Sequence, residues 1–252
     1  MNHSHQGIIR IGTSGIVVPG TKLTFPEEFK AGSRLHYYGS LFNTLEINSS
    51  FYKIPQAKTF AKWAIEVPDD FKFTVKCWRG ITHAKQLDFS MADIDLFMTA
   101  IASLGEKSGC LLIQFPASIH FQHIQKVEKI LARITEKNNN EQWKLAIELR
   151  HPSWYCDAAY AMFQKYSAAV VIHDMPGSST PSDVPASNLI YRRFHGPIGN
   201  YNGGYSDDLI HSYAEEISNW HKTINNIYIY FNNTMGSALQ NAQLLQKLIS
   251  VP

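Results

Sequence analysis

The sequence predicts an α/β fold, an irregular TIM-type (β/α)8 barrel that forms a single domain over residues 1–252. Three observations lead to this prediction. Short apolar runs rich in β-branched and aromatic residues alternate with longer amphipathic segments. The apolar runs recur at intervals of roughly 30 residues, the length of one βα unit. The chain of 252 residues is also close in length to one eightfold barrel.

Eight apolar runs have the length and composition of β-strands. They occupy residues 8–13, 44–48, 72–77, 110–115, 144–149, 168–173, 189–195 and 227–231. Because helical segments separate most of them, we expect parallel strands joined by right-handed crossovers.

Seven segments between the strands have the periodicity of amphipathic helices. They span residues 33–42, 59–66, 91–104, 123–137, 153–165, 207–221 and 237–249. Within 91–104, for example, Ile94, Phe97, Met98 and Ile101 follow a helical spacing. The connection between the sixth and seventh strands differs, because residues 174–188 are rich in Pro, Ser and Gly. This composition predicts a loop without a full helix.

The main rival architecture is an open, doubly wound sheet that binds a dinucleotide. Such a sheet usually has a glycine-rich turn directly after its first strand. Here Gly12 and Gly15 lack the GxGxxG spacing, and no helix begins promptly after them. Eight βα-like units in one chain of this length therefore favour the closed barrel.

Composition and charge argue against several classes of partner. Basic and acidic residues number 23 and 21, a balance that indicates neither a nucleic-acid nor a membrane partner. No run approaches the ~18 apolar residues of a membrane span, and the first residues lack the apolar stretch of a signal peptide. Cys77, Cys110 and Cys156 form no CxxC pair and no disulfide framework. We therefore expect a cytoplasmic protein, and the sequence leaves its oligomeric state open.

Polar and charged residues gather at the last positions of strands that are otherwise apolar. Six of them form pairs spaced two residues apart: Glu46 and Asn48, Glu148 and Arg150, and Arg193 and His195. Lys76, Gln114 and Asn232 stand at the ends of three further strands. Because side chains alternate in direction along a strand, the members of each pair share a face. If that face is the interior, these groups converge at the carboxyl-terminal mouth, where barrel enzymes have their active sites.

The residue types at this mouth predict acid–base chemistry on a small anion. The expected catalytic residues are Glu46, Glu148, His195 and Lys76. Two carboxyl groups in one pocket can take different pKa values, a histidine titrates near neutral pH, and a desolvated lysine can act as a nucleophile. The expected substrate-binding residues are Asn48, Tyr52, Gln114, Arg150, Arg193 and Asn232. Guanidinium groups suit carboxylate or phosphate, so we expect a small anionic, sugar-like substrate. Hydrolysis, isomerisation and lyase chemistry all stay open.

A divalent metal is one alternative. Glu46, Glu148, Asp174 and His195 are the ligand types of metal-dependent sugar isomerases and phosphodiester nucleases. The sequence has no HxH or HExxH pair, and the neighbouring Arg and Lys residues oppose a cation. We therefore predict no cofactor and no metal site, and keep the metal-dependent enzyme as an alternative.

Two further alternatives involve no catalysis. The ionisable residues could form a structural network of ion pairs, because an unpaired charge in an apolar interior is costly. The chain could also be a module that binds nucleotides or nucleic acid by stacking on aromatic side chains. The candidates for stacking are Phe51, Tyr52, Trp78, Trp154 and Tyr201.

Several sequence blocks carry a family resemblance. They are IGTSG at 11–15, FNTLEINSSFYKIP at 42–55, FTVKCWRGITH at 73–83, IQFP at 113–116, ELRHPSW at 148–154, YRRFHG at 191–196 and YFNNT at 230–234. In these blocks the chain resembles the YecE-like family, catalogued as domain of unknown function 72. The resemblance implies a TIM-type barrel without a securely established activity, and its motifs coincide with the polar strand ends. The chain departs from the family after Gly15, where Ile16 and Val17 replace the aromatic residues of relatives.

Overall fold

The computed structural model describes residues 7–185 and 187–250. Most of the stretch on which we predicted the absence of a signal peptide, residues 1–6, lies outside the described residues. Strands alternate with helices along the chain, and every strand pairing is parallel. The strands are β1 (Ile8–Thr13), β2 (Thr44–Ile47), β3 (Lys72–Lys76), β4 (Ser108–Phe115), β5 (Lys144–Leu149), β6 (Ala168–Val170), β7 (Ile172–His173), β8 (Leu189–Phe194) and β9 (Asn226–Phe231). The predicted α/β class with parallel strands is therefore confirmed.

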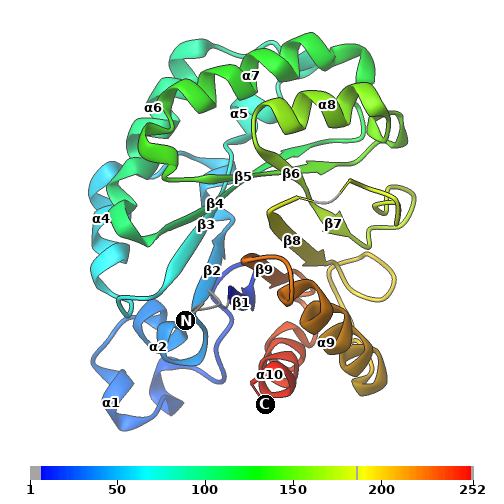
Figure 1. The fold of residues 1–252 in the computed structure, drawn as a ribbon. Helices are drawn as coiled ribbons and strands as arrows, with labels where there is room; N and C mark the ends of the chain where they lie inside the picture. The colour runs from blue at the N-terminus through cyan, green and yellow to red at the C-terminus, as the bar shows by residue number, and fades with distance from the viewer. Residues whose placement is uncertain (1–6, 186, 251–252) are drawn as a thin grey trace, which may run out of the picture.

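Helices lie around the outside of these strands (Figure 1). The α-helices are α1 (Glu27–Lys30), α2 (Arg34–Leu41), α3 (Ser49–Tyr52), α4 (Ala57–Ile65), α5 (Arg79–Thr82), α6 (Met91–Ile101), α7 (Ile124–Lys137), α8 (Asp157–Lys165), α9 (Asp207–His221) and α10 (Ala238–Ile249). Short 3-10 turns are η1 (Lys22–Thr24), η2 (Lys85–Leu87), η3 (Ala102–Lys107), η4 (Phe121–His123), η5 (Asn139–Glu141) and η6 (Pro152–Trp154). Each of the seven expected helices is present, with its ends shifted by a few residues. Serine caps set some starts: Ser33 Oγ accepts a hydrogen bond from His36 N, and Ser206 Oγ from Leu209 N.

The strands pair as two sheets, so the expected single ring of eight strands is not what the structure shows. One sheet has the order β1-β9-β8-β7 and the other the order β2-β3-β4-β5-β6. The sixth expected strand, 168–173, is divided at Val171, because its first part pairs with β5 and its last part with β8. At the other junction, the described part of the chain shows no ladder between β1 and β2, and an isolated parallel bridge joins Ser14 to Glu46. The described residues between β7 and β8 form no helix, which confirms the loop predicted there.

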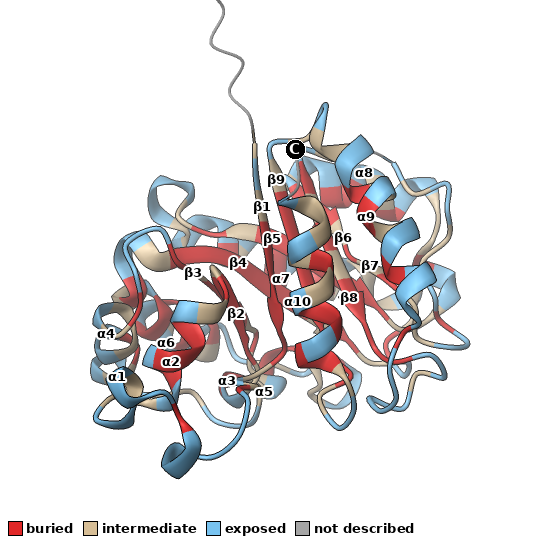
Figure 2. Ribbon diagram, turned by 90° about the horizontal axis from the view of Figure 1, so that it is seen from below, coloured by how far each residue is buried: buried red, intermediate tan, exposed pale blue. Residues whose placement is uncertain are grey.

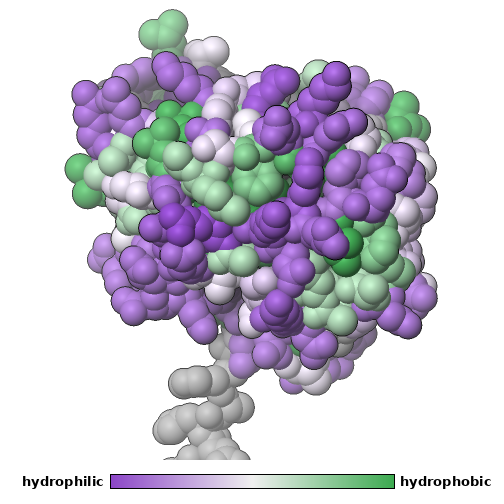
Figure 3. Space-filling view, turned by 90° about the horizontal axis from the view of Figure 1, so that it is seen from above, coloured by the Kyte–Doolittle hydropathy of each residue, from purple (hydrophilic) through white to green (hydrophobic). Residues whose placement is uncertain are grey.

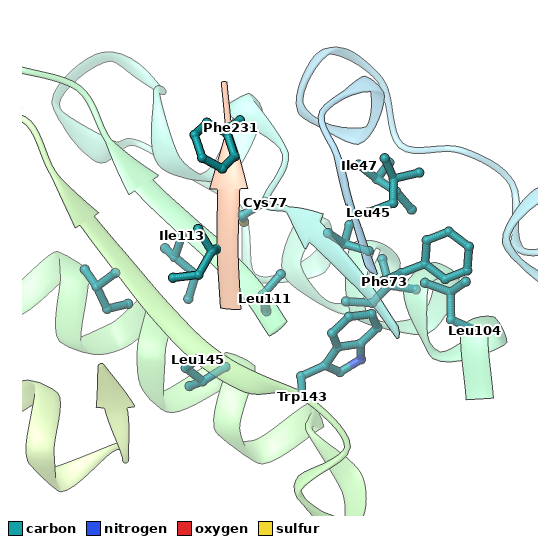
Figure 4. Close-up of a cluster of buried hydrophobic side chains, with 14 of the residues drawn as sticks. Leu45, Ile47, Phe73, Cys77, Leu104, Leu111, Ile113, Trp143, Leu145 and Phe231 are labelled. Atoms are coloured by element: carbon teal, nitrogen blue, oxygen red, sulfur yellow. The ribbon is translucent and has the colours of Figure 1, made fainter. Parts of the chain in front are cut away.

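The buried apolar side chains form two clusters, one on each face of the strands. The smaller cluster takes residues from both sheets: Cys110, Leu112, Ala146, Ala169, Val171, Leu189, Tyr191, Tyr228 and Tyr230. The larger cluster lies between the strands and the helices and includes Leu111 and Ile113 of β4 (Figure 4). Residues 110 and 112 thus face one core and residues 111 and 113 the other, as strand alternation requires. We call the side of the smaller cluster the inner side.

Polar residues cover the outer faces of the helices. Figure 2 shows buried residues along the strands and exposed residues on the outward sides of the surrounding helices. Hydrophilic residues predominate on the face shown in Figure 3, with apolar residues in patches between them. Within residues 7–185 and 187–250, none of the helices combines the length and apolar character needed to cross a membrane.

Candidate functional site

The carboxyl ends of the strands bring ionisable side chains together on the inner side. Glu46 and Arg193 each lie next to last in their strands, β2 and β8, and Glu148 holds the same position in β5. Parallel strands end at a common edge, so these side chains meet although up to 147 residues separate them in the chain. We refer to Glu46, Glu148, Arg150, Arg193 and His195 as the ionic cluster.

Arg193 joins the two glutamates. Its Nε and Nη2 atoms donate to Glu46 at 3.0 and 2.8 Å, and its Nη1 donates to Glu148 Oε2 at 2.6 Å. All three residues are buried, so each charge depends on the others for compensation. The bidentate contact with Glu46 also fixes the plane of the guanidinium group.

Both glutamates are held in the ionised form. Burial favours the neutral acid, but the charge of Arg193 and the hydrogen bond from Tyr191 outweigh it and lower the pKa of Glu46. For Glu148, burial is outweighed by the charges of Arg150 and Arg193, which hold its pKa well below the ordinary value. Both carboxylates are therefore anionic partners of the guanidinium groups near neutral pH, and the acid–base roles expected for them stay a prediction.

On the inner side, tyrosine hydroxyl groups form hydrogen bonds to Glu46 and to two threonines. The hydroxyl of Tyr191 donates to Glu46 Oε2. The hydroxyl of Tyr230 contacts Thr44 Oγ1 at 2.6 Å and Thr74 Oγ1 at 2.7 Å. Sequence reasoning missed Tyr191, although its position two residues before Arg193 places it on the same face. The hydrogen bond from Tyr191 helps to hold the carboxylate of Glu46 in place.

His195 has its protonation state set by its neighbours. Its Nε2 lies 2.9 Å from Arg150 Nη2 and 3.3 Å from Arg193 Nη1. Guanidinium groups only donate, so Nε2 accepts and the proton is on Nδ1, which lies 3.2 Å from Asp174 Oδ1. Burial lowers the pKa of His195, although the hydrogen bond to Asp174 opposes this. The imidazole is therefore neutral.

Asp174 is held in turn by the loop after β8. The hydroxyl of Tyr205 donates to Asp174 Oδ2, and the backbone N of His195 donates to Asp174 Oδ1 at 2.8 Å. Sequence reasoning did not find Tyr205, since nothing in the glycine-rich stretch around it signals a contact 31 residues away. These bonds make Asp174 a support for His195.

Lys76 differs from the other cations at this edge. It ends β3 on the inner side, and its Nζ lies 4.3 Å from the centroid of the Phe51 ring. Among the described residues, Nζ has no carboxylate within 4.0 Å and no hydrogen bond. Burial, assisted by the charge of Arg193, lowers the pKa of Lys76 to about 8. Lys76 is thus an ammonium group that loses its proton easily.

The remaining expected site residues lie around this edge. Gln114 pairs in register with Glu148, and its Nε2 lies 3.5 Å from His83 Nε2. Asn48 follows β2, and its buried Oδ1 has no partner within the described residues. Tyr52 is 70% exposed on α3 and packs against Phe51, so it lies at the rim.

Two other expectations fare differently. Asn232 is buried beyond β9, where its backbone N donates to Phe194 O at 2.7 Å, and no side-chain bond joins it to the ionic cluster in the described part of the chain. Trp154, considered for stacking on bases, is fully buried and donates through Nε1 to Ile119 O. It is therefore not available to a ligand.

The acidic residues do not converge on a metal. Within the described residues, no group of three or more His, Cys, Asp or Glu side chains is placed to hold one. The oxygens of Glu46 and Glu148 face guanidinium groups, and those of Asp174 face His195 and Tyr205. A cation placed among them would meet hydrogen-bond donors and positive charge, so these residues do not fit a divalent metal.

Two cavities occur at the opposite ends of the strands. One, of about 200 Å³, is lined by the residues that precede β2 and β3, including Asn43 and Asp70, and by Gln246. The other, of about 110 Å³, lies between Ile9, Asn43 and Ser250. Neither is lined by the ionic cluster, and neither presents a charged group other than Asp70. Both cavities therefore lie apart from the carboxyl ends, where the cations and carboxylates converge.

Comparison with known proteins assigns the family. The model of the family described as "Protein of unknown function DUF72" matches residues 10–251. The chain belongs to the DUF72 family. The resemblance seen in its sequence blocks is thereby confirmed. Among curated relatives of this DUF72 protein, UPF0759 protein YunF of Bacillus subtilis is 26% identical over 90% of each chain. UPF0759 protein YecE of Escherichia coli K12 is 25% identical over 48% of this chain and 43% of its own.

Solved structures of DUF72 proteins share the fold. A DUF72 family protein of Enterococcus faecalis V583 superposes with a TM-score of 0.78 and 23% identity, covering 97% of this chain and 96% of that one. A DUF72 family protein of Thermotoga maritima MSB8 has a TM-score of 0.77 and 26% identity, covering 96% and 99%. The architecture of parallel strands and outer helices is therefore that of the family.

Proposed function

We propose that this DUF72 protein is an enzyme that binds a small polar anion at the carboxyl ends of its strands and uses Lys76 to transfer a proton. The single observation that carries the proposal is the state of Lys76. It is a partly buried ammonium group without an ionic partner, beside carboxylates that are already paired. A group with a pKa of about 8 is populated in both protonation states near neutral pH, as general acid–base catalysis requires.

The other charged residues take supporting roles in this proposal. Arg150 keeps 11% of its side chain exposed, so it can reach a ligand together with Lys76. Arg193 is 1% exposed and serves to hold Glu46 and Glu148. His195 accepts from Arg150 and thereby orients it. The catalytic roles first expected for the glutamates and the histidine become positioning roles.

The proposal treats the two sheets as one interrupted barrel. The Ser14–Glu46 bridge would close one junction and the divided segment 168–173 the other. The inner cluster supports this treatment because both sheets contribute side chains to it. In this arrangement the ionic cluster forms the floor of a mouth, and Lys76 and Arg150 face the incoming anion.

The experiment compares two lysines of the same strand. Lys76→Met removes the proposed ligand-binding amine, and Lys72→Met removes a lysine at the other end of β3, whose Nζ donates to Glu106 O. Calorimetry would measure affinity for inorganic phosphate, and proton NMR would follow a panel of phosphorylated and carboxylated sugars. We expect Lys76→Met to weaken phosphate binding by about tenfold or more and to abolish turnover, because a charge-assisted contact is lost. Lys72→Met should preserve both, and equal behaviour of the two variants would contradict the proposal.

A further inference from the structure

Two buried polar atoms at the ends of β1 and β2 have no hydrogen-bond partner among the described residues. Asn48 Oδ1 is buried without a hydrogen bond in the described residues. The same holds for Ser14 Oγ, which lies beside Glu46 but forms no hydrogen bond of normal geometry. Buried polar atoms nearly always have partners, so two such atoms next to an unpaired ammonium group point to a ligand or ordered water.

Asn48 and Lys76 lie at the ends of the neighbouring strands β2 and β3. β2 and β3 pair from Thr44↔Lys72 to Ile47↔Val75, and Asn48 and Lys76 follow directly after the last of these partners. Adjacent strands are about 4.8 Å apart, which is within the reach of one small molecule. Ser50 Oγ donates to Lys76 O at 2.7 Å and ties the start of α3 to the end of β3.

Ser14 lies on the other side of β2, directly after the end of β1. Its parallel bridge to Glu46 sets it beside β2, two residues before Asn48 along the strand direction. Gly12 pairs with Tyr230 of the inner cluster, so Ser14, two residues after Gly12, lies on the same side. The ends of β1, β2 and β3 thus carry a hydroxyl, an amide and an ammonium group on neighbouring strands.

The chemistry of these groups selects the ligand. An amide oxygen only accepts hydrogen bonds, so Asn48 Oδ1 requires a ligand that donates. The positive charges of Lys76 and Arg150 disfavour a cationic donor and favour a neutral one, such as a hydroxyl group. The same ligand must carry an anionic group for Lys76, whereas a carboxylate without hydroxyl groups would leave Asn48 Oδ1 unpaired.

We infer that the substrate is a hydroxylated anion, a polyol carboxylate or a polyol phosphate, whose hydroxyl groups bind Asn48 and Ser14 while its anionic group binds Lys76 and Arg150. This inference rests on the function proposed above and specifies its substrate class. Water satisfies the same atoms before binding, and a hydroxyl group replaces it with equivalent hydrogen bonds. Recognition of hydroxyl groups is therefore a property of the β1–β2–β3 side of the site.

The test uses pairs of probes that differ only in hydroxyl groups. Calorimetry would compare gluconate with hexanoate, and glycerol phosphate with propyl phosphate, on the full chain. We expect the hydroxylated member of at least one pair to bind more tightly, and the pair in which this occurs tells carboxylate from phosphate. Asn48→Leu should lower the affinity for the hydroxylated probe by roughly three- to tenfold, the effect of one hydrogen bond. The affinity for the probe without hydroxyl groups should stay unchanged. Asn219→Leu, which changes an exposed asparagine of α9, serves as the matched control.

The outcomes separate this inference from the proposed function. Equal affinity within both pairs, or equal weakening of both members by Asn48→Leu, overturns the inference. If Lys76→Met then still removes anion binding, the proposed function stands without it. If Lys76→Met binds every probe as the wild type does, or if no probe binds the wild type, both the inference and the proposed function are contradicted. The comparison within each pair on wild-type protein needs no variant, so it decides even if Asn48→Leu fails to fold.

Discussion

The cationic side chains at the two ends of the strands have different kinds of partner. At the amino ends, Arg10 donates to the backbone oxygens of Asn43 and Asp70 at 3.1 and 2.8 Å, and Lys72 donates to Glu106 O. At the carboxyl ends, the guanidinium groups instead contact carboxylates: Arg193 contacts those of β2 and β5, and Arg150 contacts Glu148, two residues before it. Among the described residues, backbone oxygens accept from the cations of the amino ends, whereas at the carboxyl ends the guanidinium groups have carboxylate partners and Lys76 has none. The comparison separates these paired cations from Lys76, on which the proposed function depends.

The largest effect should come from breaking the centre of the ionic cluster. Arg193→Met leaves Glu46 and Glu148 buried with fewer partners, and we expect it to reduce the free energy of unfolding by about 3–5 kcal/mol. Arg192→Met is the matched control, because the preceding residue of β8 pairs with the exposed Glu216 on the other face. It should cost about 1 kcal/mol. Urea denaturation would measure both, and equal losses would mean that the cluster is not the interior feature described above.

A smaller effect of opposite sign should come from Lys76. Its pKa of about 8 lies below the ordinary value of 10.5, so the buried ammonium group costs stability below pH 8. Lys76→Met should therefore raise the free energy of unfolding at pH 7, by an amount on the order of 3 kcal/mol at most. The gain should shrink as pH rises from 8 to 10.5, where the wild type loses that charge.

The control for this effect is again the lysine at the amino end. Burial also lowers the pKa of Lys72, but less of that side chain is enclosed and a backbone oxygen accepts from it. Denaturation of both variants between pH 7 and 10 would sharpen the comparison of the two ends. A Lys76→Met variant less stable than the wild type at pH 7 would show that the ammonium group has a partner.

Sequence patterns were sufficient to predict the helices and the convergence of the ionic cluster at the strand ends. Alternation at 46 and 48, 148 and 150, and 193 and 195 followed from strand geometry alone. The division of 168–173 did not, because Val170, Val171 and Ile172 read as one apolar run, and only pairing with β5 or β8 divides it. Local sequence carries no information on which neighbour a strand will bond.

The pairing within the cluster was equally hidden from the sequence. Glutamate, arginine and histidine at strand ends are compatible with either an acid–base set or a network of ion pairs. The contact between Arg150 and His195, 45 residues apart, decides the tautomer of the imidazole. Tyr205 reaches Asp174 from a loop that has no periodic pattern. Residue types could be predicted to meet, but their hydrogen-bond partners depend on side-chain directions that only the folded structure determines.

The central claim is that Lys76 is an ammonium group without an ionic partner, poised to bind an anion and exchange a proton. NMR titration of the protein with isotopically labelled lysine, assigned through Lys76→Met, would measure the pKa of this residue directly. The account predicts a midpoint near 8 in the free protein and a higher one when a bound anion stabilises the charged form. A midpoint near 10.5 that does not move with added phosphate would contradict it.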